Sequence, residues 1–233
     1  MAFIGGKPHL NIELSKDMDI WAVKEFLSFD DNDMFSNTIL TLNPELEKAR
    51  DLDTNARENY YITYIDKKYI GEDIFLNETK ADLVESWNHI EDQFLEATRK
   101  LFNNHPWPQG SYVGFLSIFN CNPRFLNQKT FQCYYKHDEG LVYVCAHEML
   151  HFMFYDYIDT HNQLKDDATE SQIWNLSEIF NVVLLGTSTF SEITKNKNPK
   201  PYPKHEDLIG KFSDLWKSTQ DVDAFISKTL ELL

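Results

Sequence analysis

Apolar and polar residues alternate along the chain with two different periods, and these periods predict both helices and strands. The clearest helical pattern lies in residues 77–102, where apolar side chains recur at spacings of four and three. These side chains are Leu83, Trp87, Ile90, Phe94, Ala97 and Leu101. A single apolar stripe of this kind is typical of a helix that packs against a core.

Shorter patterns place strands in the first part of the chain and helices in the second. The expected strands are residues 9–14, 112–119 and 130–135. The expected further helices are residues 17–29, 141–157, 168–185, 205–216 and 221–232, with another helix start at Asn43 and Pro44. Residues 60–70 fit a strand or a helix, and both interpretations stay open.

This order of elements predicts an α+β protein. Loops are expected at residues 103–110, 136–140, 159–167 and 196–203. No repeat or linker divides the sequence, so we expect a single domain over residues 1–233. Its strand-containing part should reach to about residue 140, and a mainly helical part should occupy residues 141–233.

The helix expected at residues 141–157 contains the sequence HEMLH, which is an HExxH motif. On an α-helix, positions four apart lie on the same face, so His147 and His151 can both reach one metal ion. Glu148 follows the first histidine and flanks the same side, from where it can take a proton from a zinc-bound water as general base. The motif therefore predicts a Zn²⁺ site with hydrolytic chemistry.

The residues around the motif strengthen this prediction because they are almost all apolar. They are Leu141, Val142, Val144, Met149, Leu150, Phe152, Met153 and Phe154. Two histidines and a glutamate inside such a buried helix would each be costly without partners, and a metal ion satisfies all three. Incidental histidines on a partly exposed helix are the competing interpretation.

A catalytic zinc site usually has three protein ligands and one open position. The metzincin spacing is absent, because Phe154 and Tyr157 stand where that class has a glycine and a ligand. Glu178 is a better third ligand, since a carboxylate in the middle of an apolar helix is nearly always paired or metal-bound. Asn181, about one turn later, is placed to orient a ligand.

Two rivals for the third ligand have simpler explanations. Glu170 lies at the expected helix start, where the helix dipole favours an acid. His161 lies in a polar loop, where a solvated side chain is the ordinary outcome. We therefore favour Glu178 over both.

HEMLH followed by a second helix with a glutamate resembles the gluzincin zinc metallopeptidases, the thermolysin-like and aminopeptidase-like enzymes. The resemblance covers roughly residues 111–186. It implies a zincin-like fold, with a small mixed sheet packed on the active-site helix, and the roles of ligands for His147, His151 and Glu178 and of base for Glu148. It also implies that the strand at residues 130–135 is an edge that pairs with an extended peptide substrate.

Two features depart from the gluzincin pattern. The spacing between His151 and Glu178 is longer than in thermolysin-like enzymes, and no segment matches the aminopeptidase motif that grips a free amine. Enzymes of this kind also supply a Tyr or His that stabilises the oxyanion. Tyr202 and His205, in and after a proline-rich loop, are candidates, with packing as the competing interpretation.

Composition narrows the classes of partner. The net charge of −15 repels phosphate backbones, so we expect no nucleic-acid partner. The first residues lack a basic segment followed by a long apolar one, so we expect no signal peptide, no membrane span and a cytoplasmic location. Three cysteines without a CxxC pair predict neither a zinc ribbon nor a disulfide framework.

These features together predict a zinc-dependent metallopeptidase that hydrolyses bonds in a peptide or protein substrate. A catalytically inactive zinc-binding or interaction protein of zincin fold is the alternative. A structural protein with incidental histidines is a third interpretation.

Overall fold

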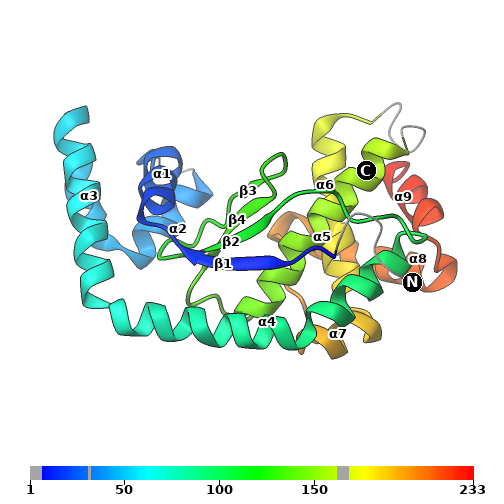
Figure 1. Cartoon of the computed structure of the whole chain (residues 1–233). Coiled ribbons are helices and arrows are strands. Elements are labelled where there is room, and N and C mark those ends of the chain that lie inside the picture. Colours follow the sequence, from blue (N-terminus) through cyan, green and yellow to red (C-terminus); the bar gives the residue numbers. More distant parts are fainter. Residues whose placement is uncertain (1–6, 31–32, 162–167) are drawn as a thin grey trace. The chain divides into compact units, whose positions relative to one another are not determined.

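The fold is that of a computed structural model, which describes residues 7–30, 33–161 and 168–233. Helices dominate this part of the chain, and four strands form one small sheet (Figure 1). The elements are β1 (Leu10–Leu14), α1 (Lys16–Phe26), α2 (Met34–Leu42), η1 (Pro44–Ala49), α3 (Thr54–Gly71), α4 (Asp73–Leu101), β2 (Tyr112–Ser117), β3 (Arg124–Phe125), β4 (Thr130–Tyr134), α5 (Leu141–Thr160), α6 (Glu170–Leu185), α7 (Ser188–Thr194), η3 (Pro203–His205), α8 (Glu206–Thr219) and α9 (Val222–Leu230). The predicted α+β class is confirmed.

The chain divides into two compact units. The first unit comprises Met1–His9, Trp87–Gly110 and Val142–Leu233, and the second comprises Leu10–Ser86 and Ser111–Leu141. The sheet therefore belongs to the second unit, and almost all of the HExxH helix α5 belongs to the first. The single domain expected from the sequence stays a prediction.

The sheet of the second unit has the strand order β1-β2-β4-β3. The first three of these strands are parallel to their neighbours, and the two-residue strand β3 pairs antiparallel with β4. Three strands match the segments predicted from the sequence. The strand β3 was not predicted, because two residues carry no period.

The strand β4 is not the edge that the gluzincin resemblance implied. It lies between β2 and β3 in the sheet. On its β3 side, the Gln132 N–H donates to the Pro123 carbonyl and the Tyr134 N–H donates to Asn122 Oδ1. The backbone donors that an added peptide strand would need at these positions are therefore already used.

Close packing within the sheet explains one glycine. A Cβ atom at Gly114 in β2 would lie 2.8 Å from Phe131 Cζ and 3.2 Å from Ile12 Cδ1. Both neighbours are buried, and they come from the strands that flank β2. Any larger side chain at position 114 would force these two apart.

The helices of the second unit settle the open segment and correct one boundary. Residues 60–70 are helical, as part of α3, whose N-cap Asp53 accepts a hydrogen bond from the Ala56 N–H. The helix α1 ends at Phe26 and not at residue 29. Phe29 has a φ of 56°, a left-handed conformation that a continuing helix cannot contain.

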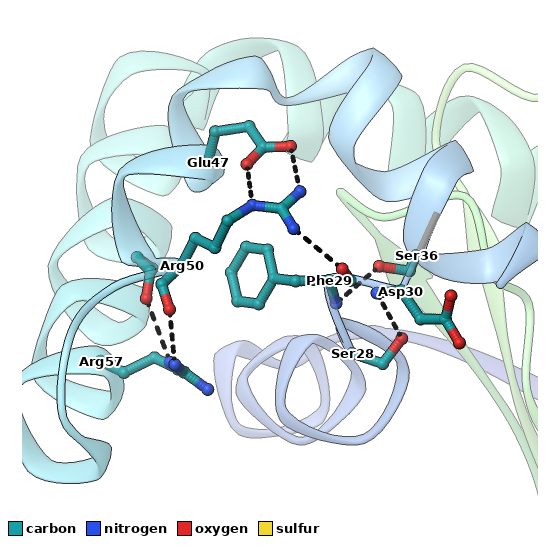
Figure 2. A network of polar contacts seen from close by, with 8 residues as sticks. Ser28, Phe29, Asp30, Ser36, Glu47, Arg50 and Arg57 are labelled. Atoms are coloured by element: carbon teal, nitrogen blue, oxygen red, sulfur yellow. Dashed lines mark hydrogen bonds and ion pairs between the residues drawn. The ribbon is translucent and has the colours of Figure 1, made fainter. Parts of the chain in front are cut away.

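Arginine side chains fix this turn after α1 (Figure 2). The Arg50 Nη1–H donates to the Phe29 carbonyl at 2.9 Å, while the other guanidinium nitrogens of Arg50 donate to Glu47. The guanidinium groups of Arg50 and Arg57 lie over the Phe29 ring, 5.2 and 5.3 Å from its centroid. These contacts hold Phe29 in its unusual conformation.

The long helix α4 confirms the predicted element but buries a slightly different face. Leu83, Trp87 and Phe94 are buried as expected, whereas Ile90 and Ala97 are only half-buried. Buried in their place is Glu91, whose carboxylate accepts a hydrogen bond from Trp87 Nε1 and contacts His9 Nδ1. A satisfied carboxylate can occupy a core position that the apolar pattern assigns to its neighbour.

Aromatic rings form the centre of the first unit. Phe180 of α6 contacts Phe154 of α5 at 5.1 Å, Phe102 after α4 at 5.4 Å and Phe225 of α9 at 5.9 Å between ring centroids. The helix α6 also packs against α7 and α8. Phe180 therefore ties the helix with the predicted glutamate ligand to the helix with HExxH.

Within the described residues, no helix combines the length and the apolarity that crossing a membrane requires.

Candidate metal centre

The two helices that carry the candidate ligands form for local reasons. The helix α5 holds residues 147–151 in regular α conformation near its middle. The helix α6 begins with a capping box, in which the Thr169 hydroxyl accepts from the Gln172 N–H and the Gln172 side chain accepts from the Thr169 N–H. Glu178 follows in the middle of α6, on a segment that is buried from Leu176 onward.

Three side chains from these helices converge. His147 Nε2 lies 3.3 Å from Glu178 Oε2, and His151 Nε2 lies 3.4 Å from Glu178 Oε1. The two Nε2 atoms lie 3.0 Å apart. One ligand atom from each residue lies within 4.8 Å of the other two. The structure therefore brings together the three residues that were predicted as zinc ligands.

The spacing of these atoms fits a tetrahedral ion. Bonds of roughly 2.0–2.1 Å from zinc to nitrogen or oxygen place neighbouring ligand atoms roughly 3.3–3.4 Å apart. The 3.0 Å between the two Nε2 atoms and the 3.3 Å from His147 Nε2 to Glu178 Oε2 are close to that value, and the 3.4 Å contact of His151 Nε2 is with the other carboxylate oxygen, Oε1. Two imidazole nitrogens and one carboxylate oxygen are also a common protein ligand set for catalytic zinc. The donor set fits a metal that keeps one position open.

The group is buried, and His147 is its most exposed member. The exposed fraction of the side chain is 17% for His147, 5% for Glu178 and 0% for His151. Burial raises the pKa of Glu178, but the charge of His151 and hydrogen bonds with both histidines outweigh it and hold that pKa far below 4.5. The carboxylate is thus kept as an anion, which is the form that binds a cation.

Polar contacts behind the group hold the two helices in register. Asn181 Nδ2 donates to the backbone carbonyl of His147 at 2.8 Å. The Ser177 hydroxyl donates to the Trp174 carbonyl, so the Tyr155 hydroxyl, 3.2 Å away, donates to Ser177 Oγ. Asn181 was predicted to orient a ligand, and its contact is with the backbone of that ligand.

Tyr143 and Ser177 are neighbours of the group that the sequence interpretation missed. The Tyr143 ring lies 6.0 Å from that of His147, and the Tyr155 ring lies 6.2 Å from that of His151. These four rings occupy positions four apart on α5, so a helical spacing of four would have identified Tyr143. Ser177 gave no such signal.

Glu148, the predicted base, is 5% exposed and lies on α5 directly after His147. It is not a member of the three-residue group. A carboxylate that is adjacent to a metal group without belonging to it is what the role of a base requires. Its role stays a prediction.

The two rivals for the third ligand lie elsewhere among the described residues. Glu170 is exposed in the first turn of α6. His161 Nδ1 lies 2.8 Å from the Tyr157 carbonyl, and its ring stacks on that of Tyr157. The Tyr157 hydroxyl donates a hydrogen bond to Asp223, so this tyrosine joins α5 to α9. The polar loop predicted at residues 159–167 begins too early, because α5 continues to Thr160, and residues 162–167 lie outside the described residues.

The two predicted oxyanion candidates pack on α6, about one turn before Glu178. His205 is buried, and its Nε2–H donates to Asn175 Oδ1 at 2.9 Å. The Tyr202 ring lies 5.5 Å from that of Trp174. Burial and the charge of Lys204 lower the pKa of His205 below 6.5, while the charge of Glu178 acts in the opposite direction.

Neither His205 nor Tyr202 belongs to the metal group itself. Their predicted role in stabilising an oxyanion stays a prediction.

No protein-family model, no curated protein and no solved structure matches this chain. The gluzincin resemblance therefore stays a prediction from the sequence motif.

Proposed function

We propose that this protein is a zinc-dependent metallopeptidase of zincin-like fold. The observation that supports the proposal is the convergence of His147, His151 and Glu178 at distances suited to one tetrahedral ion. These three residues would hold the zinc. The substrate would be a peptide or protein.

Zinc bound to this group supplies Lewis acidity toward water and carbonyl groups. Glu148 supplies the proton transfers: its carboxylate takes a proton from the attacking water and returns it to the nitrogen of the departing amine. With a metal bound, both imidazoles would have released any proton and would be neutral, so Glu178 would be the one anionic ligand. His205 or Tyr202 would donate a hydrogen bond to the developing oxyanion.

One observation favours the alternative, a zinc-binding protein without peptidase activity. The amides of Gln132 and Tyr134 in β4 are already bonded to residues of the same unit. The strand that gluzincins would use to bind an extended substrate is thus unavailable at these positions. Both proteins would bind zinc, but only the peptidase would use Glu148 as a general base.

The test compares two glutamate variants. Glu148→Gln should keep one zinc per chain, measured by metal analysis, and should lower hydrolysis of a fluorescence-quenched peptide library by about 10²–10⁴-fold. Glu170→Gln, an exposed glutamate of α6, is the matched control and should keep both zinc and turnover.

Full turnover by Glu148→Gln would remove the base from the mechanism. Stoichiometric zinc in the wild type with no hydrolysis of any library member would support the inactive zinc-binding protein. No zinc in the wild type would leave only the interpretation with incidental histidines.

A further inference from the structure

A second candidate site lies in the first unit and shares no residue with the metal group. Segments from α4, α6, α7, α8 and α9 and the loop after α7 line an open cavity of about 1000 Å³. None of its lining residues belongs to the His147–His151–Glu178 group. The volume is at the upper end of those of small-molecule sites.

The charge of the lining differs from that of the protein. Lys100, Lys197 and Lys217 line the cavity, and no Asp or Glu is found among its described lining residues. The chain as a whole carries 37 acidic and 22 basic residues. The charged side chains among these lining residues are therefore all positive, although the protein as a whole is acidic. Such a region favours an anionic ligand.

Two of the three lysines also have a role within their own helices. Lys100 and Lys217 lie in the last turns of α4 and α8, where the helix dipole favours a cation. Each also pairs with an acid of its own helix, Lys100 with Glu96 at 3.5 Å and Lys217 with Asp214 at 2.9 Å. Exposed pairs of this kind are weak, so both ammonium groups can turn to a ligand.

Lys197 has neither explanation. It is exposed in the loop between α7 and η3, and it makes no ion pair with any residue in the described ranges. It lines the same cavity as the two helix-end lysines. Three cationic side chains from three separate segments therefore line one cavity.

The other half of the lining is apolar. Val182 and Phe190 are buried side chains at its wall, and Trp216 adds a half-buried indole ring. Val222, at the start of α9, is also buried. An inorganic anion would gain nothing from this surface, whereas an alkyl chain or an aromatic ring would.

We propose that this cavity binds an amphipathic organic anion, a carboxylate or sulfonate on an apolar body. The apolar body packs on Val182, Phe190 and Trp216, and the anionic group is held by Lys100, Lys197 and Lys217. The proposal does not depend on the metal, because the two sets of residues do not overlap.

The test uses 8-anilinonaphthalene-1-sulfonate as a fluorescent probe of the folded protein. Saturable binding at one site is expected, with displacement by decanoate and none by decyltrimethylammonium. The triple variant Lys100→Gln/Lys197→Gln/Lys217→Gln should bind the probe and decanoate at least about tenfold more weakly. A second variant, Ser213→Phe, fills the cavity without a change in charge and should also block binding.

The matched control is Lys195→Gln/Lys211→Gln/Lys228→Gln, which removes three exposed lysines of the same unit that do not line the cavity. It should bind as the wild type does, within about twofold. Circular dichroism verifies that each variant is folded. Equal weakening by both triple variants, displacement by the cation, or binding that does not saturate would each overturn the proposal.

Discussion

Two buried carboxylates, one in each unit, have pKa values that are shifted in opposite directions. Glu178 in the first unit has a pKa held far below its ordinary value, whereas the pKa of Asp19 in the second unit is raised to about 6. Both lie inside helices and both are almost inaccessible. Burial acts on both in the same direction, so the difference comes from their partners.

The partners of Asp19 are neutral. Its carboxylate accepts hydrogen bonds from the Ser117 hydroxyl, the Tyr69 hydroxyl and the Gln132 amide. These donors satisfy the oxygens without supplying a positive charge, so desolvation prevails. Glu178 faces two imidazoles, which can carry a proton or share a metal ion.

A buried acid by itself therefore does not indicate a metal site. The premise that a buried carboxylate has polar partners holds for both residues. Only the chemistry of the partners separates a structural acid from a candidate ligand. Nitrogen donors that converge on the acid are the distinguishing feature.

The largest expected effect is on zinc affinity. Glu178→Gln should weaken zinc binding by at least about a thousandfold, or about 4 kcal/mol, because the loss of a ligand exceeds the ten- to hundredfold effect of a supporting residue. Asp19→Asn, the same chemical change at the other buried acid, should leave zinc affinity unchanged. Competition with a chromophoric chelator measures both. Equal affinities in the two variants would contradict the assignment of the ligand.

The sequence indicated that Glu178 is buried, but it gave no such indication for Asp19, and the reason is physical. Glu178 lies in a long apolar run, so its burial is visible in the local pattern. Asp19 lies in the first turn of α1, where an exposed acid is the ordinary case. It is buried because Ser117 and Gln132 reach it from β2 and β4, and such long-range pairing leaves no local period.

The second prediction concerns pH and the second unit. The pKa of Asp19 is about 6 in the folded protein, compared with 3.8 for an ordinary aspartate. A raised pKa means that the folded state binds the proton more tightly than the unfolded chain. The stabilisation is thus complete below pH 3.8 and is lost as pH rises through about 6, an effect of roughly 3 kcal/mol.

Asp19→Asn stays neutral at every pH, so it isolates this effect. The difference in unfolding free energy between the variant and the wild type should shift by roughly 2 kcal/mol in favour of the variant between pH 4 and pH 7. Urea denaturation at several pH values, in the presence of a chelator, measures it. Titration of all other groups cancels in the difference, so a flat curve would show that Asp19 ionises normally.

Much of the fold followed from periodicity, and the rest required tertiary contacts. The pattern predicted α4 and α5 because long apolar stripes specify helices. It missed α2 and α7, whose nine and seven residues are too few for a clear stripe. The helical spacing predicted that His147 and His151 share a face, but their meeting with Glu178 depends on the Phe154–Phe180 contact between α5 and α6.

The smallest expected effect concerns the contact behind the metal group. Asn181 Nδ2 joins α6 to the backbone of His147 at 2.8 Å, so it fixes where this imidazole lies relative to Glu178. Asn181→Ala should therefore lower zinc affinity by about tenfold, or about 1.4 kcal/mol, with the three ligands intact. Zinc titration against the same chelator measures the change.

Asn175→Ala is the matched control, because Asn175 is an asparagine of the same helix that bonds to His205 and to no ligand. It should keep wild-type zinc affinity; if His205 stabilises the oxyanion, it should lower kcat alone. A loss of zinc in both variants would mean that α6 tolerates no change at either asparagine, and the contact with His147 would have no special role. A loss only in Asn181→Ala would show that this side chain supports a zinc ligand and does more than pack the helix. The same distinction, between a residue of the metal group and a structural residue, applies to Glu178 and Asp19.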